Sequence, residues 1–117
     1  MADKDTTTPT INKIERSETN VTLHLFIDEQ LRCFKGHFDG SPVTPGVVQL
    51  AWAINYAQIY LGLNGSVKDI GVLKFQKILL PNTHVQLELI KKSEQKFTFH
   101  YSEADASFSS GRVLLDN

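Results

Sequence analysis

The chain has 117 residues, the size of one domain, and its 41% hydrophobic and 21% charged residues exclude intrinsic disorder over the whole chain. A net charge of −1 gives no field that would attract nucleic acid or an anionic membrane surface, and no apolar run is long enough to span a bilayer. The single cysteine, Cys33, excludes an intrachain disulfide and a cysteine-based metal site, so we expect a reducing, cytoplasmic location.

The N-terminal part is predicted to contain a tail and two strands. Residues 1–9 are polar and charged, and we expect a flexible tail there, in front of a single domain over residues 10–117. A short strand is predicted from Thr10 to Ser17. The next strand is predicted over 21–27, because apolar and other side chains alternate there with the period of two that is typical of a half-buried strand.

A long apolar segment over about residues 46–61 is predicted to be a helix. Only Gln49, Asn55 and Gln58 interrupt its apolar side chains, no proline lies inside it, and Gly62 follows as a C-terminal stop. Because the segment is apolar almost all round, we expect it to be buried on most faces.

The pattern after Asn64-Gly65 changes back to strands. We predict strands over 70–77, 85–89, 96–101 and 106–115, the last interrupted near Ser110-Gly111. One helix followed by adjacent strands favours an α+β fold with an antiparallel sheet. A curved sheet wrapped around one central helix, the hot-dog arrangement, would bury such a helix. Its remaining exposed face would be a dimer surface, and dimerisation would help to complete the core of so small a domain.

The loop before the predicted helix shows the clearest sign of chemistry. Five residues restrict its backbone on both sides of His37, namely Gly36, Gly40, Pro42, Pro45 and Gly46. The unpaired N–H groups at the start of a helix suit a developing oxyanion, and histidine can act as a base near neutral pH. Such a loop could bind a thioester carbonyl and remove a proton from the adjacent carbon. The alternative is that His37 only caps the loop and that the glycines and prolines only shape a turn.

The spacing of this loop resembles a known signature. Gly36-His37-Phe38, then Gly40, Pro42 and Pro45-Gly46-Val47, is similar to G-H-F-P-G-x-P-x-x-P-G-V of the bacterial 3-hydroxyacyl-carrier-protein dehydratases. The segment from Leu73 to Pro81 also resembles the strand and turn that follow the helix in that family. The run Gly46–Leu50, followed by Trp52-Ala53, further resembles the dehydratases of aryl-polyene biosynthesis clusters.

The resemblance implies a hot-dog homodimer or heterodimer with acyl tunnels at the subunit interface. It implies that His37 is the base, that the backbone amide of Gly46 holds the thioester carbonyl, and that Gly36, Phe38, Gly40, Pro42 and Pro45 shape the loop. The reaction would be that of a hydro-lyase in fatty-acid or aryl-polyene type synthesis. A 3-hydroxyacyl chain on the phosphopantetheine of an acyl carrier protein would become a trans-2-enoyl thioester, with loss of water. Neither a metal nor an organic cofactor is implied.

Two residues depart from the family pattern. Asp39 stands where the signature usually has proline, and Ala51 stands at the position of the family's acidic residue, fourteen positions after the histidine. Alanine cannot protonate a leaving hydroxyl, and loss of a general acid costs on the order of 10² to 10⁴ in rate. His37 itself, Asp39, or a carboxylate from a related subunit could supply the proton. Asn55, one helical turn after Ala51 on the same face, could orient a water or the substrate hydroxyl.

Three functions therefore remain open. The leading hypothesis is a dehydratase that acts on acyl carrier protein substrates. The second is a catalytically incomplete hot-dog subunit of a heterodimer, and Ala51 motivates it. The third is a hot-dog thioesterase, which commonly needs a carboxylate on or near the central helix, so Ala51 counts against it as well. We expect His24, His84 and His100 on the surface of the sheet or at a turn.

Overall fold

The computed structural model describes residues 7–34 and 43–116. Within these ranges the chain forms six strands, one α-helix and one 3₁₀ turn. In chain order these are β1 (Thr10–Arg16), β2 (Asn20–Ile27), η1 (Arg32–Phe34), α1 (Gly46–Tyr60), β3 (Ser66–Phe75), β4 (Thr83–Ser93), β5 (Lys96–Glu103) and β6 (Ala106–Asp116).

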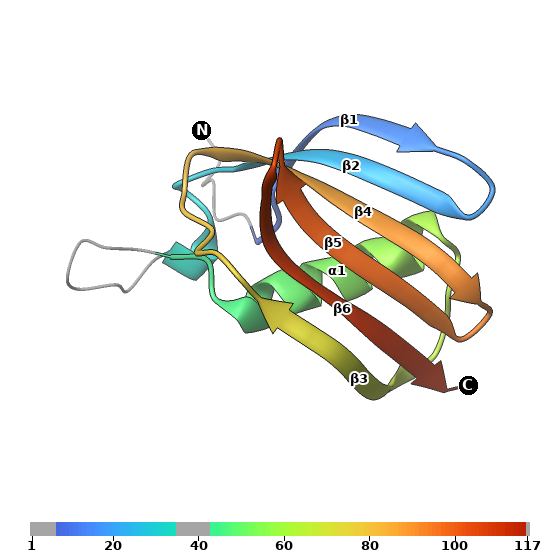
Figure 1. The fold of residues 1–117 in the computed structure, drawn as a ribbon. Helices are drawn as coiled ribbons and strands as arrows, with labels where there is room; N and C mark the ends of the chain where they lie inside the picture. The colour runs from blue at the N-terminus through green and yellow to red at the C-terminus, as the bar shows by residue number, and fades with distance from the viewer. Residues whose placement is uncertain (1–6, 35–42, 117) are drawn as a thin grey trace.

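The six strands form one antiparallel sheet in the order β1-β2-β4-β5-β6-β3. The sheet curves, and α1 lies against its inner face (Figure 1). This arrangement confirms the predicted α+β hot-dog fold, in which one helix lies inside a curved antiparallel sheet. No helix within the described ranges is long and apolar enough to cross a membrane.

Alternating side chains of the central strands build one side of the core. In β2 every second residue is buried, and β4 and β5 repeat this pattern, because successive side chains of a strand point to opposite faces. The buried face of α1 completes the core with Trp52, Ala53, Tyr56 and Ala57. Burial raises the pKa of the Tyr56 hydroxyl to about 12, so this side chain is neutral and serves packing.

The helix begins and ends close to the predicted positions. Pro45 takes the N-cap position with extended backbone and offers no side-chain cap, while Leu61 takes the C-cap position. Gly62 follows with a φ of 67°, the left-handed conformation that glycine adopts most easily. The guanidinium of Arg16 on β1 donates to the carbonyl oxygen of Tyr60 at 3.0 Å and so satisfies part of the helix C-terminus.

One face of α1 remains exposed. This stripe follows the helical repeat and consists of Val47, Ala51, Asn55, Gln58 and Ile59. The apolar members at its two ends are among the most exposed large hydrophobic side chains of the chain, with Val47 at 72% and Ile59 at 59%. The other residues of the helix are buried or half-buried, so the helix is covered on most faces, as predicted, and the stripe is the face that remains exposed.

Two strand predictions were wrong in detail. β3 begins at Ser66, four residues before the predicted start at Ile70. β6 runs through Ser110 and Gly111 without the predicted interruption. The irregular pairings lie elsewhere: against β3 they fall at Val67/Asp69 and at Gly71/Lys74, and against β5 the shift falls at Tyr101/Ser102. A Cβ at position 111 would lie 2.7 Å from the Phe99 ring, so this position needs glycine. Gly111 therefore allows close packing against β5 and does not mark an interruption of the strand.

Candidate functional site

The start of α1 has the features that the sequence predicts for a carbonyl-binding site. Pro45 provides no side-chain cap, and its carbonyl accepts the first hydrogen bonds, from the amides of Val48 and Gln49 at 3.1 Å each. The amides of Gly46 and Val47 precede these donors and therefore lie outside the hydrogen bonds within the helix. The positive end of the helix dipole adds to them, so an acceptor with developing negative charge is favoured here.

Gly46 allows a close approach of the sheet to the helix start. A Cβ at this position would lie 2.6 Å from Cζ and 2.7 Å from Cε1 of the Phe75 ring at the end of β3. Real side chains do not tolerate such distances, so any larger residue would require the ring to move. Phe75 is 52% exposed and has room to move outward. Gly46 is thus explained both by helix entry and by the aromatic ring beside it.

A pocket of about 400 Å³ lies beside the helix start. We call it the Gly46 pocket, and its walls come from the helix start and from the chain that follows β3. It is lined by Val43, Thr44, Pro45, Gly46, Gln49, Phe75, Gln76, Lys77, Ile78 and Leu79. The amide of Thr44 donates to the carbonyl oxygen of Leu79 at 2.8 Å and joins the two walls. Its size is within the range of pockets that bind small organic ligands.

A second pocket, of about 610 Å³, lies on a different face of α1. We call it the Ala51 pocket, and it is lined by Thr7, Thr8, Arg32, Cys33, Val47, Val48, Ala51, Trp52 and Asn55. The structure therefore places Ala51 and Asn55 together, as the helical spacing predicts. The indole N–H of Trp52 donates to the carbonyl oxygen of Thr7 at 2.8 Å and holds the first described residues against the helix.

The described walls of these pockets contain no general acid. Among the described residues that line either pocket there is no aspartate or glutamate. The thiol of Cys33 does not replace it as a reactive group, because desolvation raises its pKa despite an opposing backbone hydrogen bond. No described residue that lines the pocket around Ala51 therefore offers a carboxylic acid in place of the one predicted to be missing.

Several predicted site residues lie outside the described ranges. These are His37, with Gly36, Phe38, Asp39, Gly40 and Pro42. The assignment of His37 as the base remains a prediction, as does the loop-shaping role of its neighbours. The described residues on either side are Phe34 in η1 and Val43, which lines the Gly46 pocket.

Gln49 is a functional candidate that the sequence reading missed. It is 3% exposed, and its Nε2 donates to the carbonyl oxygen of Thr44 at 3.1 Å. Its Oε1 accepts from the hydroxyl of Ser109 at 2.6 Å, and its backbone carbonyl accepts from the hydroxyl of Tyr101 at 2.7 Å. In the sequence Gln49 only interrupts an apolar helix. The signal available in the sequence was an amide side chain about one turn after the glycine that begins the helix.

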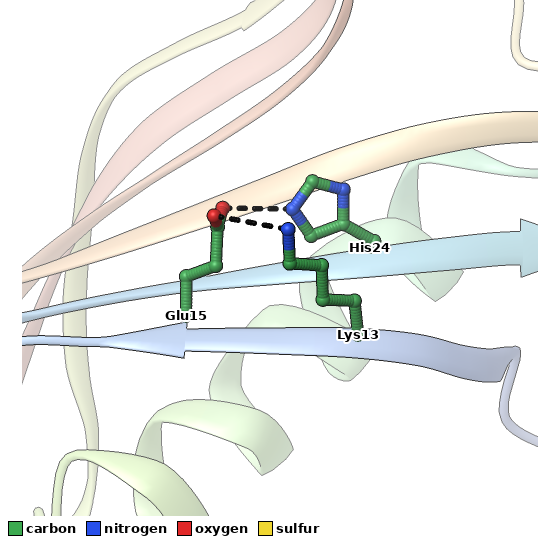
Figure 2. Close-up of polar contacts among 3 residues, drawn as sticks. All are labelled: Lys13, Glu15 and His24. Carbon is green, nitrogen blue, oxygen red and sulfur yellow. Dashed lines mark hydrogen bonds and ion pairs between the residues drawn. The ribbon is translucent and has the colours of Figure 1, made fainter.

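The other polar clusters lie on the outside of the sheet. Figure 2 shows that Lys13 and His24 both point toward the carboxylate of Glu15. His24 Nε2 lies 2.8 Å from one carboxylate oxygen, and Lys13 Nζ lies 3.5 Å from the other. The hydrogen bond from His24, and then the charge of Lys13, lower the pKa of Glu15. His100 pairs with the hydroxyl of Ser107 at 2.8 Å, and His84 is exposed beside the Phe26 ring. These histidines lie on the sheet surface or at a turn, as predicted.

Comparisons with known proteins identify relatives over nearly the whole chain. The model of the ApeI-like family, described as ApeI dehydratase, matches residues 13–112. A chain of the dehydratase heterocomplex ApeI:P from Xenorhabdus doucetiae is 30% identical, with 94% of this chain and 99% of that chain covered and a TM-score of 0.85. An uncharacterized protein from Erwinia carotovora subsp. atroseptica is 36% identical, with 92% of each chain covered and a TM-score of 0.75.

A more distant structure shares only the fold. Zebra fish thioesterase superfamily member 2 is 10% identical, with 88% of this chain and 78% of that chain covered and a TM-score of 0.56. No curated protein sequence is significantly similar to this chain.

Proposed function

The chain belongs to the ApeI-like dehydratase family, and on that premise we propose that it dehydrates 3-hydroxyacyl thioesters carried on an acyl carrier protein, in fatty-acid or aryl-polyene type synthesis. The observation that carries this proposal is the uncapped start of α1 at Gly46, beside a pocket large enough for an acyl group. The products are a trans-2-enoyl thioester and water.

The proposed reaction begins at the thioester carbonyl. The carbonyl oxygen accepts a hydrogen bond from the Gly46 amide, and the helix dipole favours the negative charge that develops on this oxygen. His37 then takes a proton from the carbon next to the carbonyl. The electron pair of that C–H bond forms the new double bond, and the C–O bond to the 3-hydroxyl breaks. The hydroxide equivalent must receive a proton to leave as water.

We propose that a related hot-dog subunit supplies this last proton. Ala51 occupies the acid position, and no carboxylate lines the described walls of either pocket. A chain in the ApeI:P heterocomplex is similar to this one over almost its full length. A carboxylate of the partner subunit near His37 would complete that site. The second site of the dimer, where Ala51 occupies the acid position, would then lack an acid.

Exposed apolar side chains support such an association. β3 is an edge strand with most of its residues exposed, including Val67, Val72 and Leu73. An exposed, apolar edge strand favours pairing with another chain. Val47 and Ile59 on the exposed stripe of α1 extend the apolar surface that a partner would cover.

The test is enoyl product formation from a 3-hydroxyacyl carrier protein. The chain is assayed alone and together with a second hot-dog subunit of the ApeI-like family that carries a carboxylate at the position of Ala51. We expect His37→Ala to lower the rate by about 10² to 10⁴, while His84→Ala, at an exposed histidine, leaves it unchanged. Equal rates for the wild type and His37→Ala would reject His37 as the base. Release of free thiol instead of enoyl product would favour the thioesterase hypothesis.

The second candidate function is a partner subunit that shapes the acyl tunnel without catalysing the reaction alone. Ala51 favours this function, because this chain has alanine at the position where an acid is expected. In that case the chain alone is nearly inactive, and His37→Ala in this chain leaves the activity of the mixed complex unchanged. High activity of the homodimer would exclude it.

A further inference from the structure

We propose that Gln49 is a positioning residue whose side-chain amide holds the segment before α1, and with it the Gly46 amide, at a set place on the sheet. The inference rests on the proposed function for its catalytic consequence, because Gly46 is the proposed carbonyl-binding residue. The claim that Gln49 holds the segment before α1 rests only on the hydrogen bonds of Gln49 and does not depend on the proposed function.

Thr44 is held from both sides. Its amide donates to the carbonyl oxygen of Leu79 at 2.8 Å, and its carbonyl oxygen accepts from Gln49 Nε2 at 3.1 Å. Thr44 itself is 4% exposed. Only Pro45 separates it from Gly46, and the proline ring fixes one of the two backbone angles there, with a φ of −61°. The position of the Gly46 amide therefore follows that of Thr44.

Gln49 is in turn anchored to the sheet. Ser109 on β6 is fully buried and donates to Gln49 Oε1, while Tyr101 on β5 donates to the backbone carbonyl of Gln49. The orientation of the amide is determined by its partners. A carbonyl oxygen can only accept, so Nε2 must face Thr44, and Oε1 is left for the Ser109 hydroxyl. A single side chain thus links the segment before the helix to β6.

An apolar side chain would fill this position without the cost of burying an amide. Buried amides are unfavourable unless hydrogen-bonded, and their net contribution to stability is small even when they are. Glutamine here therefore fixes the position of the segment before α1 more than it adds to the free energy of unfolding. The effect belongs to the transition state, because a donor aligned with the developing oxyanion acts mainly on kcat.

The experiment combines amide hydrogen exchange at Thr44, followed by NMR, with kcat and KM on the hydroxyacyl carrier protein. Gln49→Met removes both side-chain hydrogen bonds at similar volume. We expect the Thr44 amide to exchange about tenfold faster, while the amide of Leu87 in the centre of β4 is unchanged. We expect kcat to fall by about 10- to 100-fold with little change in KM. Gln86→Met, at an exposed glutamine of β4 outside the proposed site and the exposed stripe, is the control and should change neither.

Gln49→Glu provides a pH readout that a purely structural residue would not. The carboxylate keeps the acceptor for Ser109 but has no proton to donate to Thr44. When protonated, it can donate again. Burial raises the pKa of a carboxyl group, so we expect kcat of this variant to fall as pH rises through that pKa, and the wild type to lack this limb. Ser109→Ala should give a weaker version of the Gln49→Met effect, and it replaces that variant if the latter does not fold.

Unchanged Thr44 exchange in folded Gln49→Met or, in its place, Ser109→Ala would overturn the inference. Faster exchange with an unchanged kcat would equally overturn the catalytic role. If the wild type forms no enoyl product in any pairing, the proposed function fails, and the exchange experiment still decides whether Gln49 holds the segment.

Discussion

The Gly46 pocket and the Ala51 pocket lie on different faces of one helix and differ in what they contain. The Gly46 pocket has an uncapped helix start, a glycine packed against Phe75, and a buried amide that holds the neighbouring chain. The Ala51 pocket is larger, yet its described walls contain no carboxylate, and Ala51 stands where the resemblance predicts an acid. In our proposal, one helix therefore binds the thioester carbonyl on one side and lacks a proton donor on the other. This contrast is the reason why we propose that a partner subunit completes the site.

The largest expected effect comes from filling the Gly46 pocket at its narrowest point. Gly46→Ala would place Cβ 2.6 Å from the Phe75 ring. We expect kcat/KM to fall by about 100-fold, because the Phe75 ring would be pushed from its place on the wall of the Gly46 pocket, beside the proposed carbonyl-binding amide. Overpacking should also lower the free energy of unfolding by about 1–3 kcal/mol. Steady-state kinetics and urea unfolding measure the two effects.

A double mutant tests the cause of that loss. Phe75→Leu in the Gly46→Ala background should restore part of the stability by removing the clash, whereas the sum of the single effects predicts a further loss. Additive losses would mean that the ring and the glycine do not act on each other.

The second prediction fills the gap in the Ala51 pocket. Ala51→Glu should raise kcat of the chain alone by about 100-fold if the acid is all that is missing. Ala51 is exposed, so the free energy of unfolding should change by no more than about 0.5 kcal/mol. Enoyl formation is the measurement, and Gln58→Glu, on the same exposed stripe, controls for added charge. No gain over that control would place the defect elsewhere.

The third prediction compares the two edges of the sheet. Val67 on β3 and Ile14 on β1 are each 40% exposed, on opposite edge strands. We expect Val67→Lys to weaken subunit association by about tenfold or more and Ile14→Lys to leave it unchanged, because a buried unpaired charge at an interface is costly. Sedimentation equilibrium measures both. Equal effects would show that β3 is not the associating edge.

The smallest effect concerns the outer cluster of Lys13, Glu15 and His24. The folded chain lowers the pKa of Glu15 below its unfolded value, so its contribution to stability is present at neutral pH and is lost as pH falls through the folded pKa. Glu15→Gln should slightly flatten the acid side of the curve of stability against pH. Urea unfolding at several pH values measures this, with Glu103→Gln as the control. A pH profile identical to the wild type would mean that solvent screens the contact completely.

Local periodicity predicted most of the fold correctly. The alternation over 21–27 identified β2, and the apolar run ended by Gly62 identified α1 to within one residue. The same spacing placed Ala51 and Asn55 on one face, and the structure confirms this. A strand, a helix and the residues that share a helix face all depend on neighbouring positions along the chain, so the sequence alone reveals them. The interruption predicted at Ser110-Gly111 was wrong because Gly111 serves a contact with Phe99 on β5, which local pattern does not reveal.

By itself, the sequence determined most of the elements and the glycine that opens the helix, and it predicted the absence of an acid at Ala51, because each depends on residue type and spacing. Only the tertiary structure brought Phe75 against Gly46, joined Gln49 to Ser109 sixty positions away, and left β3 as an apolar edge. These contacts arise where the curved sheet meets the helix. They depend on how distant strands order themselves around a shared core, and no periodicity along the chain encodes that order.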